Sequence, residues 1–269
     1  MRRFVAVVSL LPFVLLTLPA IAVQALAQRR GWSLARTLPG WWHRRALAAL
    51  RVRVRVTGRP VADRPLLVTP NHCSWLDIPV IGSLAPLSFV AKSEVASWPL
   101  FGLLARLQRT VFVDRTRRHA TGSAASELAG RLGDGDAMVL FPEGTSGRGD
   151  EVLPFRSALL GAARSAIVDG GHARVMVQPL VLAYTRLAGR PIDGDDRLRV
   201  SWVGDDPLVP HLWGVATAGG VEVEVIWGEP VPFDETTDRK ALAAALEARV
   251  RTRLLAALDR PEPALEPVA

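Results

Sequence analysis

The sequence predicts an α/β fold: a largely parallel mixed sheet covered by helices and preceded by a membrane-inserted N-terminal helix. Short apolar runs alternate with helix-length segments along most of the chain, as they do in βαβ units. The first thirty residues include an uncharged apolar stretch long enough for a bilayer core of ~30 Å. With 269 residues, of which 49% are hydrophobic, the chain can build one sizeable core and does not require several.

The apolar stretch covers residues 4–27 and has a pair of arginines on each side. Its length and flanks favour a helix that enters the membrane. A cleaved signal peptide is the alternative, since Ala25-Leu26-Ala27 has the small-x-small form of a cleavage site. Pro12 and Pro19 could kink the helix or turn it into a re-entrant hairpin, so the sequence predicts insertion and leaves spanning open.

Arginines and tryptophans are dense in residues 31–50, which predicts a basic segment at the level of the lipid headgroups. The alternative is a basic connector whose tryptophans pack on the domain. Basic residues are denser after the apolar stretch than before it, so we expect the rest of the chain on the cytoplasmic side of the inner membrane. The predicted organisation is an anchor (1–30), an interfacial segment (31–50), one α/β domain (51–258) and a flexible tail (259–269).

Hydrophobic patterning predicts the elements of the domain. Residues 51–56 alternate arginine with valine like a half-exposed edge strand, whereas residues 66–68 are wholly apolar and lie between prolines, like a central strand. Further strands are predicted at residues 87–91, 110–113, 137–141, 175–183, 198–203 and 221–227. Helices are predicted at residues 75–84, 94–107, 120–132, 156–168 and 239–258.

Charge and composition restrict the partners. A net charge of +7 favours anionic partners, among them nucleic acid, phospholipid headgroups and phosphorylated substrates. The sequence has no zinc-finger spacing, recognition-helix signature or aromatic RNA-binding strand, and Tyr184 is its only tyrosine, so membrane lipid is the expected partner and nucleic acid is not. Cys73 is the sole cysteine, which excludes an intramolecular disulfide and fits a reducing compartment.

Two polar motifs directly follow predicted strands: Asn71-His72-Cys73-Ser74-Trp75-Leu76-Asp77 and Phe141-Pro142-Glu143-Gly144-Thr145. A neutral imidazole can take a proton from an alcohol when a carboxylate fixes its tautomer and stabilises the imidazolium. His72 and Asp77 can meet if His72 lies on the loop after the strand and Asp77 in the first turn of the next helix, with Ser74 as N-cap. The competing interpretation is an ordinary first-turn acid beside a loop histidine bonded to backbone.

Other chemistries fit these motifs less well. Cys73 is expected to be a small buried side chain, and Ser74 lacks the Gly-x-Ser-x-Gly elbow of a serine nucleophile. A metal site built from His72, Asp77 and Glu143 lacks the second histidine that is usual for zinc. No metal and no cofactor are therefore expected.

Four motifs occur in the order of the four conserved blocks of glycerolipid acyltransferases: residues 71–77, Val111-Phe112-Val113-Asp114-Arg115, residues 141–145 and Val177-Gln178-Pro179-Leu180. The chain resembles the bacterial lysophosphatidic acid acyltransferases, also called 1-acylglycerol-3-phosphate acyltransferases. The resemblance extends from about residue 51 to beyond Leu180 and implies that the domain at 51–258 is an acyltransferase domain.

The resemblance implies a membrane-associated enzyme that passes an acyl group directly from acyl-CoA or acyl carrier protein to the hydroxyl of a lysolipid. It implies that His72 is the general base and Asp77 its orienting partner. Substrate contacts are implied for Asn71, Lys92, Arg115, Glu143, Gly144, Thr145 and Arg148. A guanidinium fork suits a phosphate, and a glycine turn after a strand lets the backbone approach an anion. Lys92 could equally be a solvated lysine.

Two positions depart from the family pattern. Ser146 stands where the third block commonly continues with arginine, and Arg109 where the second block commonly opens with glycine; Arg148 or Arg109 could supply the missing cation. The serine, together with His211-Leu212-Trp213-Gly214, resembles the branch of lyso-ornithine lipid acyltransferases. The sequence thus favours 1-acylglycerol-3-phosphate as acceptor, giving phosphatidic acid. A lyso-ornithine lipid acceptor is the alternative, and a non-catalytic lipid-binding membrane protein is a further one.

Overall fold

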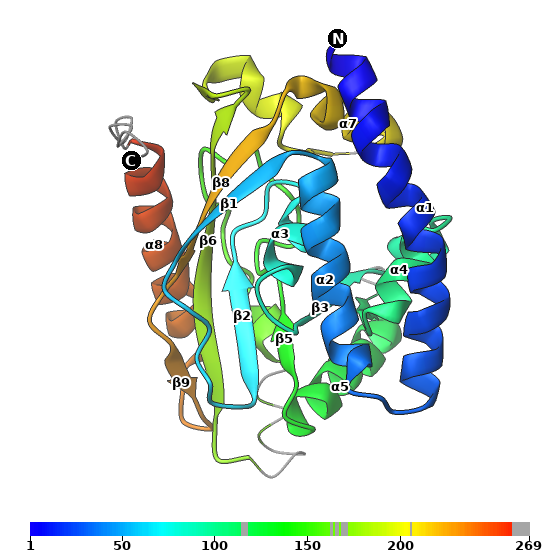
Figure 1. Cartoon of the computed structure of the whole chain (residues 1–269). Helices are drawn as coiled ribbons and strands as arrows, with labels where there is room; N and C mark the ends of the chain where they lie inside the picture. The colour runs from blue at the N-terminus through cyan, green and yellow to red at the C-terminus, as the bar shows by residue number, and fades with distance from the viewer. Residues whose placement is uncertain (114–117, 162–163, 165–166, 168–171, 205, 260–269) are drawn as a thin grey trace, which may run out of the picture.

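A computed structural model describes the chain except residues 114–117, 162–163, 165–166, 168–171, 205 and 260–269. The strands are β1 (Val52–Thr57), β2 (Leu66–Pro70), β3 (Ser88–Lys92), β4 (Val111–Val113), β5 (Ala137–Val139), β6 (Val175–Leu187), β7 (Arg190–Pro191), β8 (Val221–Trp227) and β9 (Val231–Phe233). They form one sheet with the order β1-β8-β6-β2-β5-β3-β4, and β7 and β9 pair with β6 (Figure 1). Only the pairings of β6 with β7, β8 and β9 are antiparallel among the described strands, which confirms the largely parallel mixed sheet.

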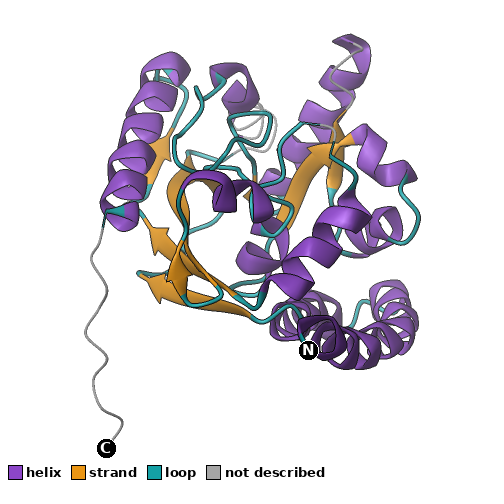
Figure 2. Ribbon diagram, turned by 90° about the horizontal axis from the view of Figure 1, so that it is seen from above, coloured by secondary structure: helices purple, strands orange, loops and turns teal. Residues whose placement is uncertain are grey.

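Helices cover both faces of this sheet (Figures 1 and 2). The α-helices are α1 (Arg2–Arg29), α2 (Leu34–Ala49), α3 (Asp77–Gly82), α4 (Phe101–Leu107), α5 (Arg118–Gly133), α7 (Leu208–Ala218) and α8 (Arg239–Leu258). Three 3-10 helices are η1 (Ser93–Ser97), η2 (Ser157–Leu160) and η3 (Gly194–Arg199). One hydrophobic core joins the sheet to α2, α3 and α7, and the other joins the opposite face to α5 and α8.

The strand pattern places the functional loops at one edge. β2 is buried at all five positions and lies between β6 and β5, as its wholly apolar sequence predicts. β1 is an edge strand, and its arginines Arg53 and Arg55 pair with Glu222 of β8. Because β2, β5, β3 and β4 are parallel, the segments that follow their carboxyl ends converge at the same edge of the sheet.

Two predicted elements need correction, a third is described only in part, and one helix was not predicted. Residues 198–203 form no strand: η3 is followed by a crossing segment, residues 200–202, whose backbone bonds to the loops after β2 and β5. The helix predicted at residues 94–107 is split into η1 and α4, because Pro99 disfavours helical backbone before it and Leu100 has a φ of 60°. Helix α7 was not predicted from the sequence. Helix α8 has the bounds that were predicted for it. The helix predicted at residues 156–168 begins as η2, and several of its residues lie outside the described part.

Helix α1 is long and apolar enough to cross a membrane, and most of its apolar surface is exposed. It stacks along α2 on the outside of the domain, as both views show (Figures 1 and 2). Its two ends also touch the domain: Arg2 donates to the Ala218 carbonyl of α7, and Gln28 donates to the Leu107 carbonyl of α4. The predicted N-terminal apolar helix is confirmed, and Pro12 and Pro19 lie inside it without ending it.

The basic segment after it is mostly helix α2, and its tryptophans behave differently from one another. Trp42 donates to the Thr17 hydroxyl of α1 and packs on Phe13, so it belongs to the α1–α2 interface. Trp41 lies under the guanidinium of Arg45, and Trp32 is exposed. Trp42 therefore fits the packing interpretation, and the interfacial interpretation of the segment stays a prediction.

Candidate active site

His72 and Asp77 meet at the carboxyl end of β2. His72 lies on the loop after the strand and Asp77 is the first residue of α3, as predicted, and the distance from His72 Nδ1 to Asp77 Oδ2 is 2.7 Å. Because this bond occupies Nδ1, a neutral His72 carries its proton there and presents Nε2 as a base. His72 retains 20% of its side-chain exposure, and its ring stacks on Phe141 with centroids 4.0 Å apart.

Asp77 is completely buried and is held by four N–H and O–H donors, with the Cys73 thiol as a weaker fifth at 3.9 Å from Oδ1. Its Oδ2 accepts the backbone N–H of Cys73 and Ser74 as well as His72 Nδ1, and its Oδ1 accepts the Tyr184 hydroxyl at 2.8 Å. An ionised carboxylate is an acceptor only, which suits donors on both of its oxygens. The arrangement therefore fixes the imidazole and supplies the charge that stabilises an imidazolium.

Tyr184 was not predicted as a site residue. It lies on β6 and is fully buried, and burial together with the charge of Asp77 raises its pKa well above 10, so it stays a neutral donor. Its contact with Asp77 joins residues 107 positions apart, and nothing local in an apolar strand signals such a contact. The only unusual feature of Tyr184 in the sequence is that it is the chain's single tyrosine.

The side chains of Cys73 and Ser74 are both buried, and the Cys73 thiol lies 3.9 Å from Asp77 Oδ1. Burial and the charges of Asp77 and Glu143 raise the pKa of the Cys73 thiol, so it remains protonated and is a poor nucleophile. Ser74 is not the N-cap of α3, because Leu76 precedes the helix; its hydroxyl donates to the Val200 carbonyl of the crossing segment at 2.7 Å.

Asn71 and Glu143 support the backbone around His72. The Asn71 side chain is buried and bonds both the N–H and the carbonyl of Leu182 on β6. Glu143 Oε1 accepts the His72 N–H at 3.1 Å, while Oε2 has no hydrogen-bond partner among the described residues. Burial raises the pKa of Glu143 to about 8, partly offset by the bond from the His72 N–H and increased by the charge of Asp77.

The loop after β5 folds over the His72 loop. Gly144 turns the chain with a φ of 76°, and the Gly147 N–H donates to the His72 carbonyl at 2.9 Å. Thr145 and Arg148 are exposed beside it. Lys92 is exposed at the carboxyl end of β3, on the same edge of the sheet, and Arg115 lies outside the described residues.

The crossing segment, residues 200–202, is hydrogen-bonded to the loop after β2 and to the loop after β5. Besides accepting the Ser74 hydroxyl, it donates the Trp202 N–H to the Cys73 carbonyl and accepts the Ser146 hydroxyl on the Trp202 carbonyl. Ser146 is thus used internally, at the position where arginine is common in the resembled family. The sequence missed this segment because residues 198–203 alternate apolar and polar side chains, as half-buried strands do.

Comparisons with known proteins agree with this geometry. An acyltransferase family model matches residues 53–183. The chain is 49% identical over 233 residues, 87% of this chain and 86% of the relative, to the lyso-ornithine lipid O-acyltransferase of Brucella abortus. The chain belongs to the lysolipid acyltransferase family.

Two further relatives differ in acceptor. The lyso-ornithine lipid O-acyltransferase of Rhizobium meliloti is 44% identical over 90% of this chain and 82% of its own length. The 1-acyl-sn-glycerol-3-phosphate acyltransferase of Neisseria gonorrhoeae is 32% identical over 77% of this chain and 76% of its own. The crystal structure of the 1-acyl-sn-glycerophosphate acyltransferase of Thermotoga maritima has the same fold, with a TM-score of 0.67 at 23% identity over 98% of this chain and 100% of that one.

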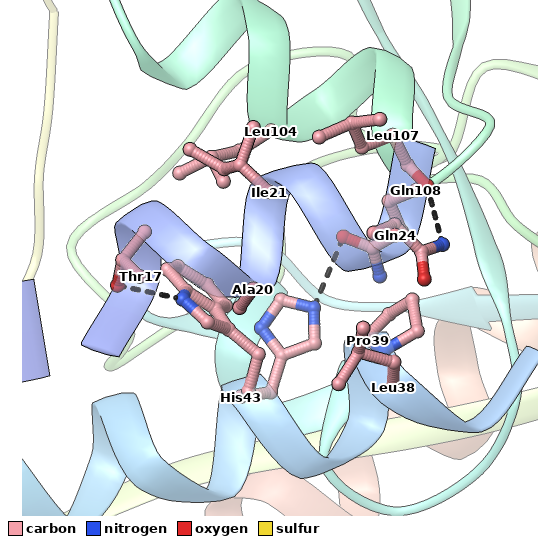
Figure 3. Close-up of a pocket in the computed structure, with 11 residues that line it drawn as sticks. Thr17, Ala20, Ile21, Gln24, Leu38, Pro39, His43, Leu104, Leu107 and Gln108 are labelled. Atoms are coloured by element: carbon pink, nitrogen blue, oxygen red, sulfur yellow. Dashed lines mark hydrogen bonds between the residues drawn. The ribbon is translucent and has the colours of Figure 1, made fainter. Parts of the chain in front are cut away.

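In this lysolipid acyltransferase, a small cavity of about 50 Å³ lies between α1, α2 and α4, apart from the His72 loop (Figure 3). His43 of α2 borders it, and burial lowers the pKa of this imidazole to about 4. The same helix clamps α3: a Cβ on Gly82 would lie 2.5 Å from His43 Cδ2, and Arg44 donates to the Ser83 carbonyl at 3.0 Å. Helix α2 therefore links the N-terminal helix to the short helix that begins with Asp77.

Proposed function

We propose that this chain is a lyso-ornithine lipid O-acyltransferase. The observation that carries the choice of acceptor is the greater identity of the chain to two enzymes of that name than to the 1-acyl-sn-glycerol-3-phosphate acyltransferase of Neisseria gonorrhoeae, over most of each chain. Ser146 supports the choice, because its hydroxyl donates to the Trp202 carbonyl and offers no cation to a phosphomonoester. 1-Acylglycerol-3-phosphate is the second candidate, favoured by the exposed Arg148 beside the site.

The reaction follows from the placement of His72. Its Nε2 takes the proton of the acceptor hydroxyl while that oxygen attacks the carbonyl carbon of an acyl thioester. The new C–O bond gives a tetrahedral intermediate. Its collapse breaks the C–S bond, and the leaving thiolate takes the proton back from Nε2. Asp77 stabilises the imidazolium between the two transfers, so no acyl-enzyme and no cofactor are needed. We propose acyl-CoA or acyl carrier protein as the thioester.

The remaining predicted site residues divide by position. Asn71 and Glu143 hold the backbone of the His72 loop, so their proposed contribution is to position the base. Gly144 and Thr145 line the turn next to it, and Lys92 and Arg148 are the exposed cations proposed to face the anionic part of the acceptor. Arg115 keeps its predicted role in acceptor binding.

We further propose that α1 anchors the enzyme to the inner membrane, with the domain at residues 51–258 on the cytoplasmic side. The contacts of both ends of α1 with the domain support a helix that lies along the domain and buries its outward apolar face in lipid. The arginine-rich α2 then lies at the level of the headgroups, close to anionic phospholipid.

The deciding experiment compares lyso-ornithine lipid with lysophosphatidic acid as acceptors, using membranes that contain the expressed chain and one acyl thioester. Transfer to lyso-ornithine lipid with the higher kcat/KM is expected. A higher kcat/KM with lysophosphatidic acid would assign the second candidate instead, and transfer to neither acceptor would contradict both.

A further inference from the structure

Arg197 is a nearly buried cation that uses little of its hydrogen-bonding capacity. Its side chain keeps 13% of its exposure, and its guanidinium contacts the Gly149 and Ile192 carbonyls, each at 3.5 Å. Its ion pair with Asp150 is 3.9 Å long. A guanidinium carries five N–H donors, and among the described residues these long contacts are its only polar ones. The geometry leaves donors for an anion.

Asp150 lies between this guanidinium and that of Arg148. The same oxygen, Oδ2, is 3.8 Å from Arg148 Nε and 3.9 Å from Arg197 Nε, beyond hydrogen-bond distance in both cases. The Asp150 side chain is 42% exposed and that of Arg148 44% exposed, so both are accessible to a ligand. The three residues form a mixed cluster with one carboxylate and two guanidinium groups.

The cluster adjoins the loop that carries the base. A Cβ on Gly149 would lie 3.1 Å from both Cβ and Sγ of Cys73, so this part of the loop packs directly on the residue after His72. The positive charge of Arg197 is near enough to oppose the rise of the Cys73 pKa. A headgroup attached close to a hydroxyl at His72 can therefore reach the cluster.

We propose that Arg197 and Asp150 form a subsite for a zwitterionic headgroup, with Arg197 binding its carboxylate and Asp150 its ammonium group. The proposal rests on the proposed function: an ornithine acylated on one amine keeps a carboxylate and an ammonium. Asp150 also acts against a phosphomonoester, because a dianion that approaches either arginine meets a like charge. Arg197 lies on η3, outside the four sequence blocks, and Asp150 lies beyond the third.

The test measures KM and kcat of four proteins, wild type, Arg197→Gln, Asp150→Asn and the control Arg199→Gln, with both acceptors and one thioester. Arg199 lies on the same short helix but is half exposed and pairs with Asp196 at 3.0 Å. Arg197→Gln is expected to raise the KM for lyso-ornithine lipid about tenfold or more, the effect of losing a charged hydrogen bond. The KM for the thioester should stay unchanged, and Arg199→Gln should match the wild type.

Asp150→Asn is expected to raise the KM for lyso-ornithine lipid and to lower the KM for lysophosphatidic acid, because the substitution removes attraction for the first and repulsion of the second. It replaces a half-exposed side chain by one of equal size, so it keeps the proposal testable if Arg197→Gln fails to fold. An unchanged ratio of the two KM values in Asp150→Asn would overturn the subsite. The wild type tests the function separately: if it acylates only lysophosphatidic acid, the proposed function fails, and the subsite with it.

Discussion

Two buried carboxyl groups contact His72, and their surroundings differ. Asp77, after β2, receives four hydrogen bonds from N–H and O–H groups on its two oxygens, and a weaker one from the Cys73 thiol. Glu143, after β5, receives the His72 N–H on Oε1, and its Oε2 has no hydrogen-bond partner in the described part of the chain. Both are almost inaccessible to solvent, with exposures of 0% and 2%. Hydrogen bonding, and not burial, therefore distinguishes them.

The difference assigns each carboxyl a separate task. Donors converge on both oxygens of Asp77, so this carboxyl is arranged to accept hydrogen bonds, including the one from the His72 ring. Burial favours the neutral form of Glu143 and raises its pKa to about 8. The negative charge near His72 is thus concentrated on Asp77, while Glu143 holds the backbone without competing for the proton.

The largest effect is expected from removing His72, the side chain that Asp77 orients. His72→Ala deletes the group that we propose takes the acceptor proton, and we expect kcat to fall roughly 10⁴-fold, the upper range for a general base. Acyl transfer from a labelled thioester in membrane fractions measures it, and the fraction of protein in the membrane should not change. His172→Ala is the control, because His172 bonds to the Gly133 carbonyl, away from the site. Full activity of His72→Ala would refute the mechanism.

Asp77→Asn tests the orienting role with nearly unchanged shape. An amide cannot accept from the same four donors, and its N–H₂ group favours the tautomer that carries the proton on Nε2, where it blocks the base. We expect kcat to fall roughly 10³-fold with the KM for both substrates much less affected. Kinetics are measured beside a denaturant unfolding curve. A folded variant with near wild-type kcat would contradict the orienting role.

Tyr184→Phe removes one of the four donors and leaves Asp77 Oδ1 short of a strong partner. We expect a loss of about 1–3 kcal/mol in the free energy of unfolding, the cost of a buried acceptor left unsatisfied. The other three donors still hold the ring of His72, so kcat should fall only about tenfold, which corresponds to about 1.4 kcal/mol. Denaturant unfolding and initial rates measure the two effects. Unchanged stability would mean that the hydroxyl does not contribute to holding the carboxylate.

The sequence predicted those parts of the fold and site that are encoded locally. The half-exposed edge strand, the apolar central strand and α8 were correct because each is set by its own periodicity. The placement of His72 and Asp77 followed from one proline-bounded strand and the start of the next helix. His72 and Asp77 are only five positions apart in the sequence, so their meeting could be predicted without knowing how distant segments pack.

Long-range contacts could not be predicted in this way. Tyr184 reaches Asp77 from 107 positions away, and the crossing segment uses its backbone on loops rather than on a strand. Residues 198–203 were therefore predicted as a strand. Helix α7 was not predicted, because its sequence is mostly apolar. The same limit applies to Arg197, whose position beside Gly149 depends on how η3 packs.

Glu143→Gln tests the second carboxyl and should have the smallest effect on turnover, because glutamine keeps an acceptor oxygen for the His72 N–H. Its expected signature is a change in how stability depends on pH. The pKa of Glu143 rises from its ordinary 4.5 to about 8 on folding, so the folded chain binds more protons than the unfolded chain between these values. The free energy of unfolding contributed by this group therefore falls as pH rises through that window.

Thermal unfolding midpoints of the wild type and Glu143→Gln, measured side by side from pH 4.5 to 9, check this dependence. The wild-type midpoint should fall relative to that of the variant between about pH 5 and pH 8 and then run parallel to it. A constant difference across the range would mean that Glu143 is charged in the folded chain at neutral pH. In that case two negative charges, not one, would lie beside His72, and the assignment of separate tasks to Asp77 and Glu143 would be wrong.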